Sequence, residues 1–239
     1  IKKYYSDQLD EQKLLESRGK LFISSKREDA INLATNEGYE IAILDDGLQD
    51  NSISYDLCFV CFNNLNWIGN GLTIPAGPLR QNINSLKSYK HVFLNGNLEN
   101  LENIKRHIFE INPNINLHIG KYIPLNINEF NKDNKYLVFS GIGNHKTFVS
   151  MLKDYGINVV KDIEFPDHYK YTSYDINKII DLSNGLGYKI ITTEKDYLRL
   201  DRDKIDNINF IKSELKILDE DKLISTILKK DEKTIKRFH

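Results

Sequence analysis

Short apolar runs alternate with amphipathic stretches along most of this chain. The apolar runs have the length of buried strands, and the stretches between them repeat apolar residues at the spacing of a helix face. The predicted strands cover residues 21–24, 40–44, 56–62, 91–96, 136–143, 158–165 and 189–196. The predicted helices cover residues 26–38, 100–111, 145–156 and 173–187. Strands that alternate with helices in this way predict an α/β fold with mostly parallel sheets.

One segment interrupts the alternation. Residues 111–135 are rich in asparagine and read as a loop, so we place a domain boundary there. The sequence thus predicts two Rossmann-like or P-loop-type lobes, residues 1–120 and 121–239, with a cleft between them. Ser173 precedes the apolar pattern of the last predicted helix and is the expected N-terminal cap.

Composition narrows the class of protein. The 239 residues are 40% hydrophobic and 28% charged, which is typical of a folded globular chain. The net charge of −1 offers no broad basic field, so we expect no nucleic-acid partner. No run of 18 apolar residues and no signal peptide is visible. The chain starts without Met, and we expect that it begins inside a larger protein.

The two cysteines form a C-x-x-C spacing at Cys58 and Cys61. Because the sequence contains no second pair that could complete a zinc site, and because the surrounding residues are apolar, we interpret both as reduced thiols in the core.

Polar residues follow several predicted strands, where ligands of open α/β sheets bind. Asp45 and Asp46 follow the apolar run 40–44. Two adjacent carboxylates at a strand end can hold Mg²⁺, which prefers hard oxygen ligands. The alternative is an ordinary turn, since Asp-Gly is a common turn pair. The pattern alone leaves both open.

The strand predicted at 136–143 ends in two glycines, which belong to the segment GIGNHKT from Gly141 to Thr147. Its backbone amides could bind a phosphate at the start of the next helix. Alternatively, the segment is only a tight strand-to-helix connection. It lacks the second glycine of the Walker A pattern G-x-x-x-x-G-K-[ST], and this pattern is absent from the whole sequence.

Two further segments carry candidate chemistry. In FPDHYKY, His168 lies next to Asp167, and a histidine beside a carboxylate can act as a general base. In IGNGLTIPAGPLR, three glycines and two prolines precede Arg80. A rigid loop that presents a guanidinium is a good phosphate contact. Surface decoration and a structured turn are the respective alternatives.

Taken together, five motifs resemble one family closely. LDDGLQ, GNGLTIPAGPLR, FSGIGN, FPDH and TTEKD occur in this order, and DEQKLLESR near the start resembles the family's segment GDEPLLLAR. The chain is similar to tetraacyldisaccharide 4′-kinases, a family of lipid kinases that phosphorylate the lipid A precursor of Gram-negative bacteria. The resemblance covers nearly the whole chain. It implies two α/β lobes, with the P-loop and an N-terminal membrane helix upstream of the segment seen here.

The resemblance also assigns roles to individual residues. Mg²⁺ and ATP are the implied cofactors. Asp45 and Asp46 correspond to the family's magnesium-bearing pair. Asp10 and His168 correspond to its catalytic dyad, in which His168 is expected to accept the proton of the attacking hydroxyl. The residues implied in nucleotide binding are Glu11, Arg27, Gln49 and Arg80.

Three departures from the family pattern bear on these assignments. Asp50 replaces the histidine of DDGLQH, which is expected to remove a contact near the nucleotide or substrate. Asn63 stands where the family commonly has aspartate. Asp7 and Asp10 can both be aligned with the dyad carboxylate, and we choose Asp10 because DEQKLL aligns without a gap.

The expected function is therefore ATP-dependent phosphorylation of the 4′-hydroxyl of the tetraacyldisaccharide 1-phosphate lipid A precursor, in lipopolysaccharide biosynthesis. The expected partners are this acylated lipid and a membrane surface, at the cytoplasmic face of the inner membrane, reached through the upstream segment. Two alternatives remain at this stage. One is a metal-dependent phosphohydrolase that uses Asp45, Asp46 and His168. The other is a non-catalytic nucleotide- or lipid-binding fragment, because the chain carries no Walker A motif and is expected to be inactive alone.

Overall fold

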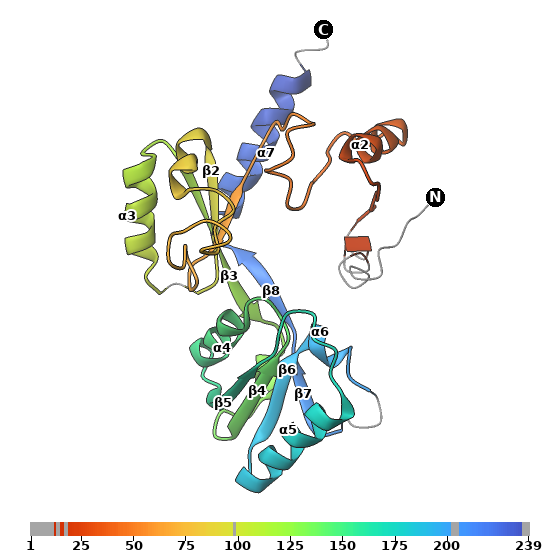
Figure 1. Ribbon diagram of the computed structural model, residues 1–239, viewed down its shortest axis with the longest axis vertical. Coiled ribbons are helices and arrows are strands. Elements are labelled where there is room, and N and C mark those ends of the chain that lie inside the picture. The colour runs from red at the N-terminus through yellow and green to blue at the C-terminus, as the bar shows by residue number, and fades with distance from the viewer. Residues whose placement is uncertain (1–11, 13–14, 17–18, 98, 202–205, 236–239) are drawn as a thin grey trace. The chain divides into compact units, whose positions relative to one another are not determined.

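The computed structural model describes residue 12 and residues 15–16, 19–97, 99–201 and 206–235. The chain forms two compact units, Ile1–Cys58 and Phe59–His239. Each unit has its own internal packing, and each is described by itself below. Figure 1 shows the helices and strands with their labels.

The first unit contains the helix α2 (Arg27–Asn36), as the sequence predicts. Gly38, with φ +86°, follows it as the expected stop. The strands expected at 21–24 and 40–44 do not form in the described part of this unit. Ile43 is 95% exposed. The described part of this unit contains no strand that could accept their backbone hydrogen bonds, so an apolar pattern alone did not make them strands.

The second unit contains two four-stranded sheets (Figure 1). The first has the order β1-β2-β3-β8, with β1 to β3 parallel and β8 antiparallel. One face of this sheet is covered by the 3₁₀ helix η2 (Ile83–Ser88) and the helix α3 (Leu101–Ile111), whose Ile104 and Ile108 pack against Val92 and Leu94. Its strands are β1 (Val60–Asn63), β2 (His91–Asn95), β3 (Asn116–Pro124) and β8 (Ser213–Ile217).

Strand β3 corrects the loop expected at 111–135. Its residues NLHIGKYIP alternate between more and less buried positions, which is the pattern of a half-buried strand. The asparagines around it hid that alternation. The boundary predicted at 120/121 falls inside β3, where pairing changes from β2 to β8. The lobe boundary stays a prediction.

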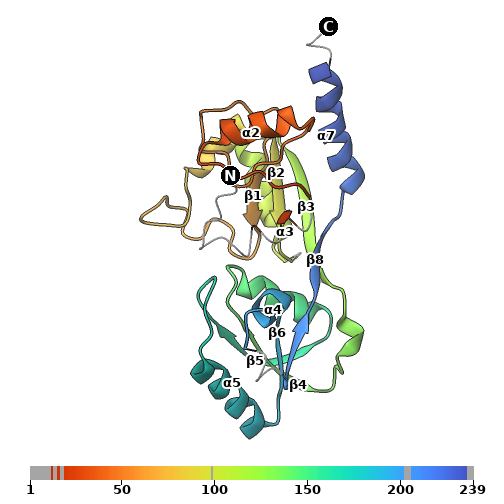
Figure 2. The same cartoon turned by 90° about the vertical axis from the view of Figure 1, so that its right-hand side faces the viewer.

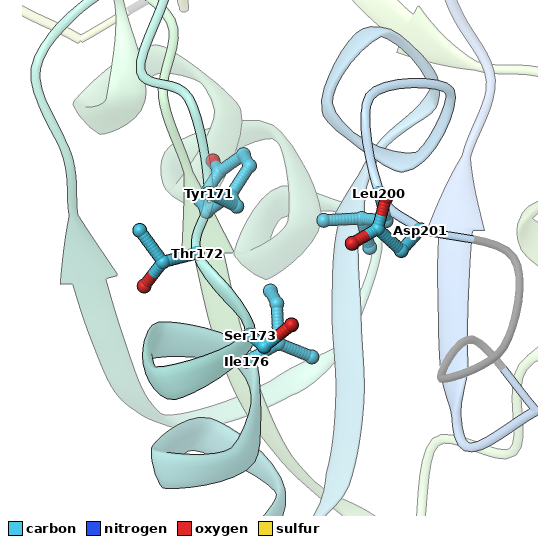
Figure 3. Close-up of a pocket in the computed structure, with 6 residues that line it drawn as sticks. All are labelled: Tyr171, Thr172, Ser173, Ile176, Leu200 and Asp201. Atoms are coloured by element: carbon cyan, nitrogen blue, oxygen red, sulfur yellow. The ribbon is translucent and has the colours of Figure 1, made fainter.

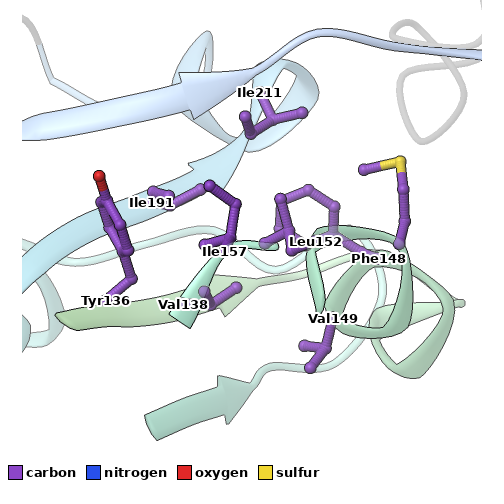
Figure 4. Close-up of a cluster of buried hydrophobic side chains, with 9 residues drawn as sticks. Tyr136, Val138, Phe148, Val149, Leu152, Ile157, Ile191 and Ile211 are labelled. Carbon is purple, nitrogen blue, oxygen red and sulfur yellow. The ribbon is translucent and has the colours of Figure 1, made fainter. Parts of the chain in front are cut away.

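The second sheet is wholly parallel, with the order β5-β4-β6-β7. Residues alternate along β4, so Val138 faces the helix α4 and Leu137 faces the helix α5. Figure 4 shows the core on the α4 side, where Leu152 packs near Val138. The elements are β4 (Lys135–Ser140), α4 (His145–Asp154), β5 (Asn158–Glu164), α5 (Ser173–Leu186), β6 (Lys189–Thr193), the short helix α6 (Glu194–Tyr197) and β7 (Ile208–Ile211).

The ends of α5 illustrate how local sequence sets a helix. Thr172, rather than the expected Ser173, is the N-cap: its hydroxyl accepts a hydrogen bond from the amide of Asp175, whose carboxylate accepts one from the amide of Thr172. Gly187 ends the helix with φ +66°. The expected cap was one residue too late because the helical pattern was read from its apolar positions.

Two further elements complete the described fold. The 3₁₀ helix η3 (Ile127–Glu129) follows β3, and the helix α7 (Glu220–Ile235) continues from β8, as Figure 2 shows. Within the described ranges, no helix is both long and apolar enough to cross a bilayer.

Both cysteines are free, but Cys61 is exposed on β1, so the expectation that both lie in the core is wrong. The prediction of an α/β fold with mostly parallel sheets is confirmed.

Candidate functional site

A fully buried carboxylate joins the segments that follow the strands of the second sheet. Asp196 lies in α6, just after β6, and has no exposed surface. Its Oδ2 accepts hydrogen bonds from the Gly141 amide (3.1 Å) and the Thr193 hydroxyl (2.7 Å). Its Oδ1 accepts one from the Tyr171 hydroxyl (3.1 Å). Because a buried carboxylate needs such partners, Asp196 ties three sequence motifs together.

The same carboxylate lies beside Arg199, one helical turn further on. Arg199 Nη1 is 3.6 Å from Asp196 Oδ1, and the arginine side chain is only 15% exposed. The other guanidinium nitrogen, Nη2, lies 3.3 Å from Nδ1 of His168. The predicted catalytic histidine therefore contacts a buried ion pair that the sequence analysis did not identify. The spacing Asp-x-x-Arg in TTEKDYLR was the available signal, since residues three apart share a helix face.

The backbone of His168 is also held by hydrogen bonds. His168 has φ +57°, a left-handed conformation that is uncommon for residues other than glycine. Its amide donates to the carbonyl of Gly141 (3.1 Å) and to Oδ1 of Asp167 (2.9 Å). Outliers of this kind persist where surrounding contacts hold them, and they cluster at functional sites.

The glycines of SGIGN allow this close approach. A Cβ at Gly141 would lie 3.0 Å from Tyr171 Oη and 3.2 Å from the carbonyl oxygen of Pro166. A Cβ at Gly143 would lie 3.1 Å from Asp167 Oδ2. Since Asp196 also accepts the Gly141 hydrogen bond, that amide is already used by a carboxylate. The geometry favours the tight connection over a phosphate cradle at Gly141.

Burial also affects Tyr171. Loss of solvent, together with the nearby Asp196 carboxylate, raises the pKa of Tyr171 far above that of an ordinary tyrosine. Its hydroxyl thus remains a hydrogen-bond donor to Asp196 at physiological pH.

A second group of hydrogen bonds, centred on a histidine, fixes the start of α4. The sequence analysis did not predict it. His145 is buried; its Nδ1 lies 2.7 Å from Ser140 Oγ and its Nε2 lies 3.0 Å from Asp162 Oδ2. Ser140 has no exposed surface, which excludes it as a nucleophile for a dissolved substrate in this conformation. This group of hydrogen bonds joins β4, α4 and β5 and is best explained as a structural anchor.

Arg80 stands at the end of a braced loop. Asn70 Nδ2 donates to the carbonyl of Ala76 (2.8 Å), and Thr73 forms a bridge to Leu79 across the loop. A Cβ at Gly77 would overlap Asn70 and the backbone of Leu72, so the loop closes tightly. Arg80 itself is exposed. The structure agrees with the expectation of a rigid loop that presents a guanidinium.

Asp45 and Asp46 lie in a turn of the first unit, not at the end of a buried strand. Asp46 has φ +51°, and both side chains are exposed. Arg27 Nη2 donates to the carbonyls of Asp45 (3.4 Å) and Asp46 (3.1 Å). The backbone of this turn, referred to below as the acidic turn, is therefore anchored by Arg27.

Asp50 takes part in the same anchor. Its Oδ2 accepts a hydrogen bond from Arg27 Nη1 (2.9 Å), and its Oδ1 accepts from the amide (2.9 Å) and hydroxyl (2.5 Å) of Ser52. The hydrogen bonds from Ser52 and from Arg27 lower the pKa of Asp50 to about 2. Asp50, which replaces the family's histidine and was expected to remove a contact, thus forms a contact of its own, an ion pair with Arg27.

Asn63, the third departure, has a specific role at the end of β1. Its Nδ2 donates to Thr147 Oγ1 (2.8 Å) and to Asn95 Oδ1 (3.2 Å), while its Oδ1 accepts from the amide of Leu65 (3.0 Å). An ionised aspartate could accept but not donate. The amide therefore links β1 to α4 in a way that the family's common residue could not.

The remaining assigned residues all belong to the first unit. Asp7, Asp10 and Glu11 lie outside the described residues. Gln49 is exposed in the acidic turn. No group of three His, Cys, Asp or Glu side chains that could hold a metal occurs in the described part of the chain. Two exposed carboxylates still fit Mg²⁺, which is often held by one or two carboxylates together with waters and phosphates.

The pocket shown in Figure 3 adjoins the Asp196 network, because its lining residue Tyr171 donates a hydrogen bond to Asp196. It lies at the start of α5 and measures about 240 Å³, including open solvent at its mouth. Because this figure counts the open solvent, the space that the pocket encloses is far smaller than a nucleotide needs. Its lining residues are Tyr171, Thr172, Ser173, Ile176, Leu200 and Asp201.

Comparison with known proteins places these features in a family. Residues 6–232 match the family model described as tetraacyldisaccharide-1-P 4′-kinase (LpxK). The chain is 60% identical to the tetraacyldisaccharide 4′-kinase of Pelagibacter ubique over 233 residues, which are 98% of this chain and 74% of the relative. It is 33% identical to the enzyme of that name from Rickettsia akari, over 92% of this chain and 66% of the relative.

One solved structure is similar in fold. The crystal structure described as an "apo" form of LpxK from Aquifex aeolicus in complex with ATP matches with a TM-score of 0.51. The match has 24% sequence identity and covers 85% of this chain but only 62% of that chain. It supports the α/β architecture of the chain.

The Asp50 anchor predicts an unusual titration. The folded pKa of about 2 lies below the ordinary value of 3.8, so the anchor's contribution to stability is fully present above about pH 3.8 and is lost as the pH falls through 2. In an NMR titration of the carboxyl carbons, Asp50 should titrate near pH 2, and Ser52→Ala or Arg27→Ala should raise this pKa. Ser54→Ala, the neighbouring serine, is the control. An Asp50 midpoint near 4 in the unmodified chain would contradict the anchor.

Proposed function

Because the chain belongs to the tetraacyldisaccharide-1-P 4′-kinase family, we propose that it contributes to the ATP-dependent phosphorylation of the 4′-hydroxyl of the tetraacyldisaccharide 1-phosphate lipid A precursor. The observation that carries this proposal is 60% identity to a kinase of that name over 98% of the chain. The chain spans about three quarters of that relative, and 62% of the solved Aquifex chain.

The proposed role of Arg80 is to bind phosphate oxygens of ATP. Phosphoryl transfer depends mainly on positioning and on neutralising charge that develops on the phosphate oxygens. A guanidinium supplies paired hydrogen bonds in one plane, and the contacts from Asn70 to Leu79 fix the backbone from which Arg80 extends. Rigid placement of this kind supports a binding role rather than surface decoration.

The acidic turn is the proposed magnesium-binding element. Mg²⁺, when bound, would neutralise phosphate charge, and Asp45 and Asp46 would hold it. The contribution of this chain is to fix the backbone of the turn: Arg27 binds both carbonyls, and Asp50 holds Arg27. Arg27, proposed from the resemblance as a nucleotide contact, is therefore proposed here to support the acidic turn as well, and Glu11 and Gln49 remain proposed nucleotide contacts.

His168 is the proposed catalytic residue of the second unit, in a dyad with Asp10. A sugar hydroxyl is a poor nucleophile, so a group that takes or orients its proton contributes on the order of 10²–10⁴ in rate. The Nδ1 atom of His168 already lies beside Arg199, an obligate donor. Nε2 is therefore the ring nitrogen left for the carboxylate partner. When it donates its hydrogen to Asp10, that carboxylate is the group of the dyad that takes the proton of the hydroxyl, and His168 orients it.

The lipid substrate sets the proposed location. Its acyl chains remain in a bilayer while its sugar is phosphorylated, so the enzyme must act at a membrane surface. We place it at the cytoplasmic face of the bacterial inner membrane, where ATP is available. The upstream segment implied by the family is the proposed membrane contact.

The function is tested in a chimera in which the unmatched quarter of the Pelagibacter relative is joined to this chain. The chimera should transfer phosphate from ATP to the lipid A precursor with magnesium present. The chain alone should show little turnover, because its sequence has no Walker A motif to bind the phosphates. Asp46→Ala in the chimera should remove most activity across a magnesium titration.

Different results would favour the other functions. Release of phosphate from a substrate without ATP would indicate a metal-dependent phosphohydrolase. Binding of nucleotide or lipid without turnover by the chimera would indicate a binding module. Wild-type rates in Asp46→Ala at every magnesium concentration would remove the metal assignment.

Arg80→Lys should be costly although the charge is retained, because an ammonium cannot reproduce two parallel hydrogen bonds. We expect a clear loss of kcat/KM for ATP in the chimera. Lys87→Arg, an exposed change in η2 of the same unit, is the control and should have little effect. Unchanged ATP kinetics in Arg80→Lys would show that Arg80 does not bind phosphate.

His168→Ala should lower kcat by about 10²–10⁴ with little change in the KM for ATP, because a proton-transfer group acts mainly in the transition state. Asp10→Ala should produce a similar loss, and the double variant should be little worse than either, since members of one catalytic unit are not additive. Asp7→Ala tests the alignment. Fully additive losses would argue against a dyad, and a severe loss only in Asp7→Ala would transfer the role to Asp7.

A further inference from the structure

We propose that Arg199 is a positioning residue for His168, that Asp196 holds Arg199 in place, and that this pair determines which ring nitrogen of His168 carries hydrogen. The proposal rests on the proposed function in one respect, since the catalytic role of His168 is assigned there. It assigns a role to the segment TTEKDYLR, from Thr192 to Arg199, which has no role in the proposed function.

The first step is the chemistry of the contact. Arg199 Nη2 lies 3.3 Å from His168 Nδ1. A guanidinium can only donate hydrogen bonds, so the nitrogen that faces it must accept. In the neutral imidazole one nitrogen accepts and the other carries hydrogen. A histidine that accepts at Nδ1 is therefore the Nε2–H tautomer.

A second contact favours the same tautomer of His168. Oδ1 of Asp167 lies 3.9 Å from His168 Nε2. A carboxylate near Nε2 favours hydrogen on that nitrogen, just as the guanidinium favours a lone pair on Nδ1. The two neighbours, one of each charge, thus stabilise the same tautomer from opposite sides of the ring.

The position of Arg199 is itself fixed. Asp196 has no exposed surface, and its carboxylate accepts hydrogen bonds from Gly141, Thr193 and Tyr171. With Nη1 3.6 Å from Asp196 Oδ1, the guanidinium lies against an anion that cannot rotate away without losing those bonds. Nη2 is then directed at His168 by the rigid fork of the guanidinium.

These contacts close a ring of interactions. Asp196 accepts from the Gly141 amide, the Gly141 carbonyl accepts from the His168 amide, and the His168 ring contacts Arg199, which returns to Asp196. The backbone and the side chain of His168 are thus both connected, through these contacts, to the buried carboxylate of Asp196. A purely structural role for Arg199, to balance the charge of Asp196, would account for Nη1 but not for the contact of Nη2 with His168.

The proposal is tested by ¹⁵N NMR of the histidine rings in the chain Ile1–His239, with no substrate present. Neutral His168 should be the Nε2–H tautomer alone. Arg199→Met should lose this single-tautomer signature and show Nδ1–H in addition, whereas Arg199→Lys, which keeps a donor, should restore it. Arg106→Met, an exposed arginine on α3, should leave the His168 signals unchanged.

Two results would overturn the proposal: an Nδ1–H tautomer in the unmodified chain, or an unchanged tautomer in a folded Arg199→Met variant. If Arg199→Met does not fold, the unmodified chain still decides, through the presence or absence of a scalar coupling across the hydrogen bond from Arg199 Nη2 to His168 Nδ1. Because no activity is measured, these outcomes are independent of whether the proposed kinase function is correct.

A kinetic measurement in the chimera separates positioning from stability. Arg199→Met should lower kcat by up to on the order of 10²-fold, with little change in the KM for ATP, because small misplacement of a reacting group has effects of that size. Arg199→Lys should recover part of the loss. A loss of stability with kcat unchanged would show that Arg199 has only a structural role.

Discussion

The burial of one charged carboxylate, that of Asp196, is the constraint on which the organisation of the second sheet's loops depends. A buried anion must be surrounded by donors, and here these come from three segments that are distant in sequence. Gly141, Tyr171 and Arg199 each belong to a different motif or strand end, and each is placed by the same two oxygen atoms. The left-handed backbone at His168 is held within this network.

The acidic turn of the first unit is organised by a comparable but exposed arrangement. Arg27 binds the backbone of the turn and is itself held by Asp50, which is held by Ser52. Arg27 contacts the turn through the backbone carbonyls of Asp45 and Asp46, and the hydrogen bond to Asp50, with a smaller contribution from the charge of Asp46, raises the pKa of Arg27. In both units, a charged pair away from the proposed reacting atoms fixes the backbone that carries the candidate residues.

Membership of the kinase family and these two arrangements are consistent with one view of phosphoryl transfer, in which the protein mainly positions groups and neutralises charge. The braced loop before Arg80 belongs to the same description, because its contacts fix the backbone from which the guanidinium extends. In each case the contacts fix the backbone that carries a polar candidate residue.

Sequence pattern was sufficient for the α/β class, for the helices α2 to α5 and for most strands of the second sheet, because those segments have strong periodicity and glycine stops. It was insufficient at 40–44, where an apolar run forms no strand, and at β3, where polar residues mask a strand. In both cases the deciding factor is pairing with a neighbour, which local sequence does not contain.

The candidate residues divide in the same way. Motif order by itself determined the family and pointed to Asp45, Asp46, Arg80 and His168. Only the tertiary structure decided that Arg199 lies against His168 and that Asp50 pairs with Arg27. These contacts join residues 31 and 23 positions apart, and the short range of hydrogen bonds and ion pairs makes them depend on how the chain folds back on itself.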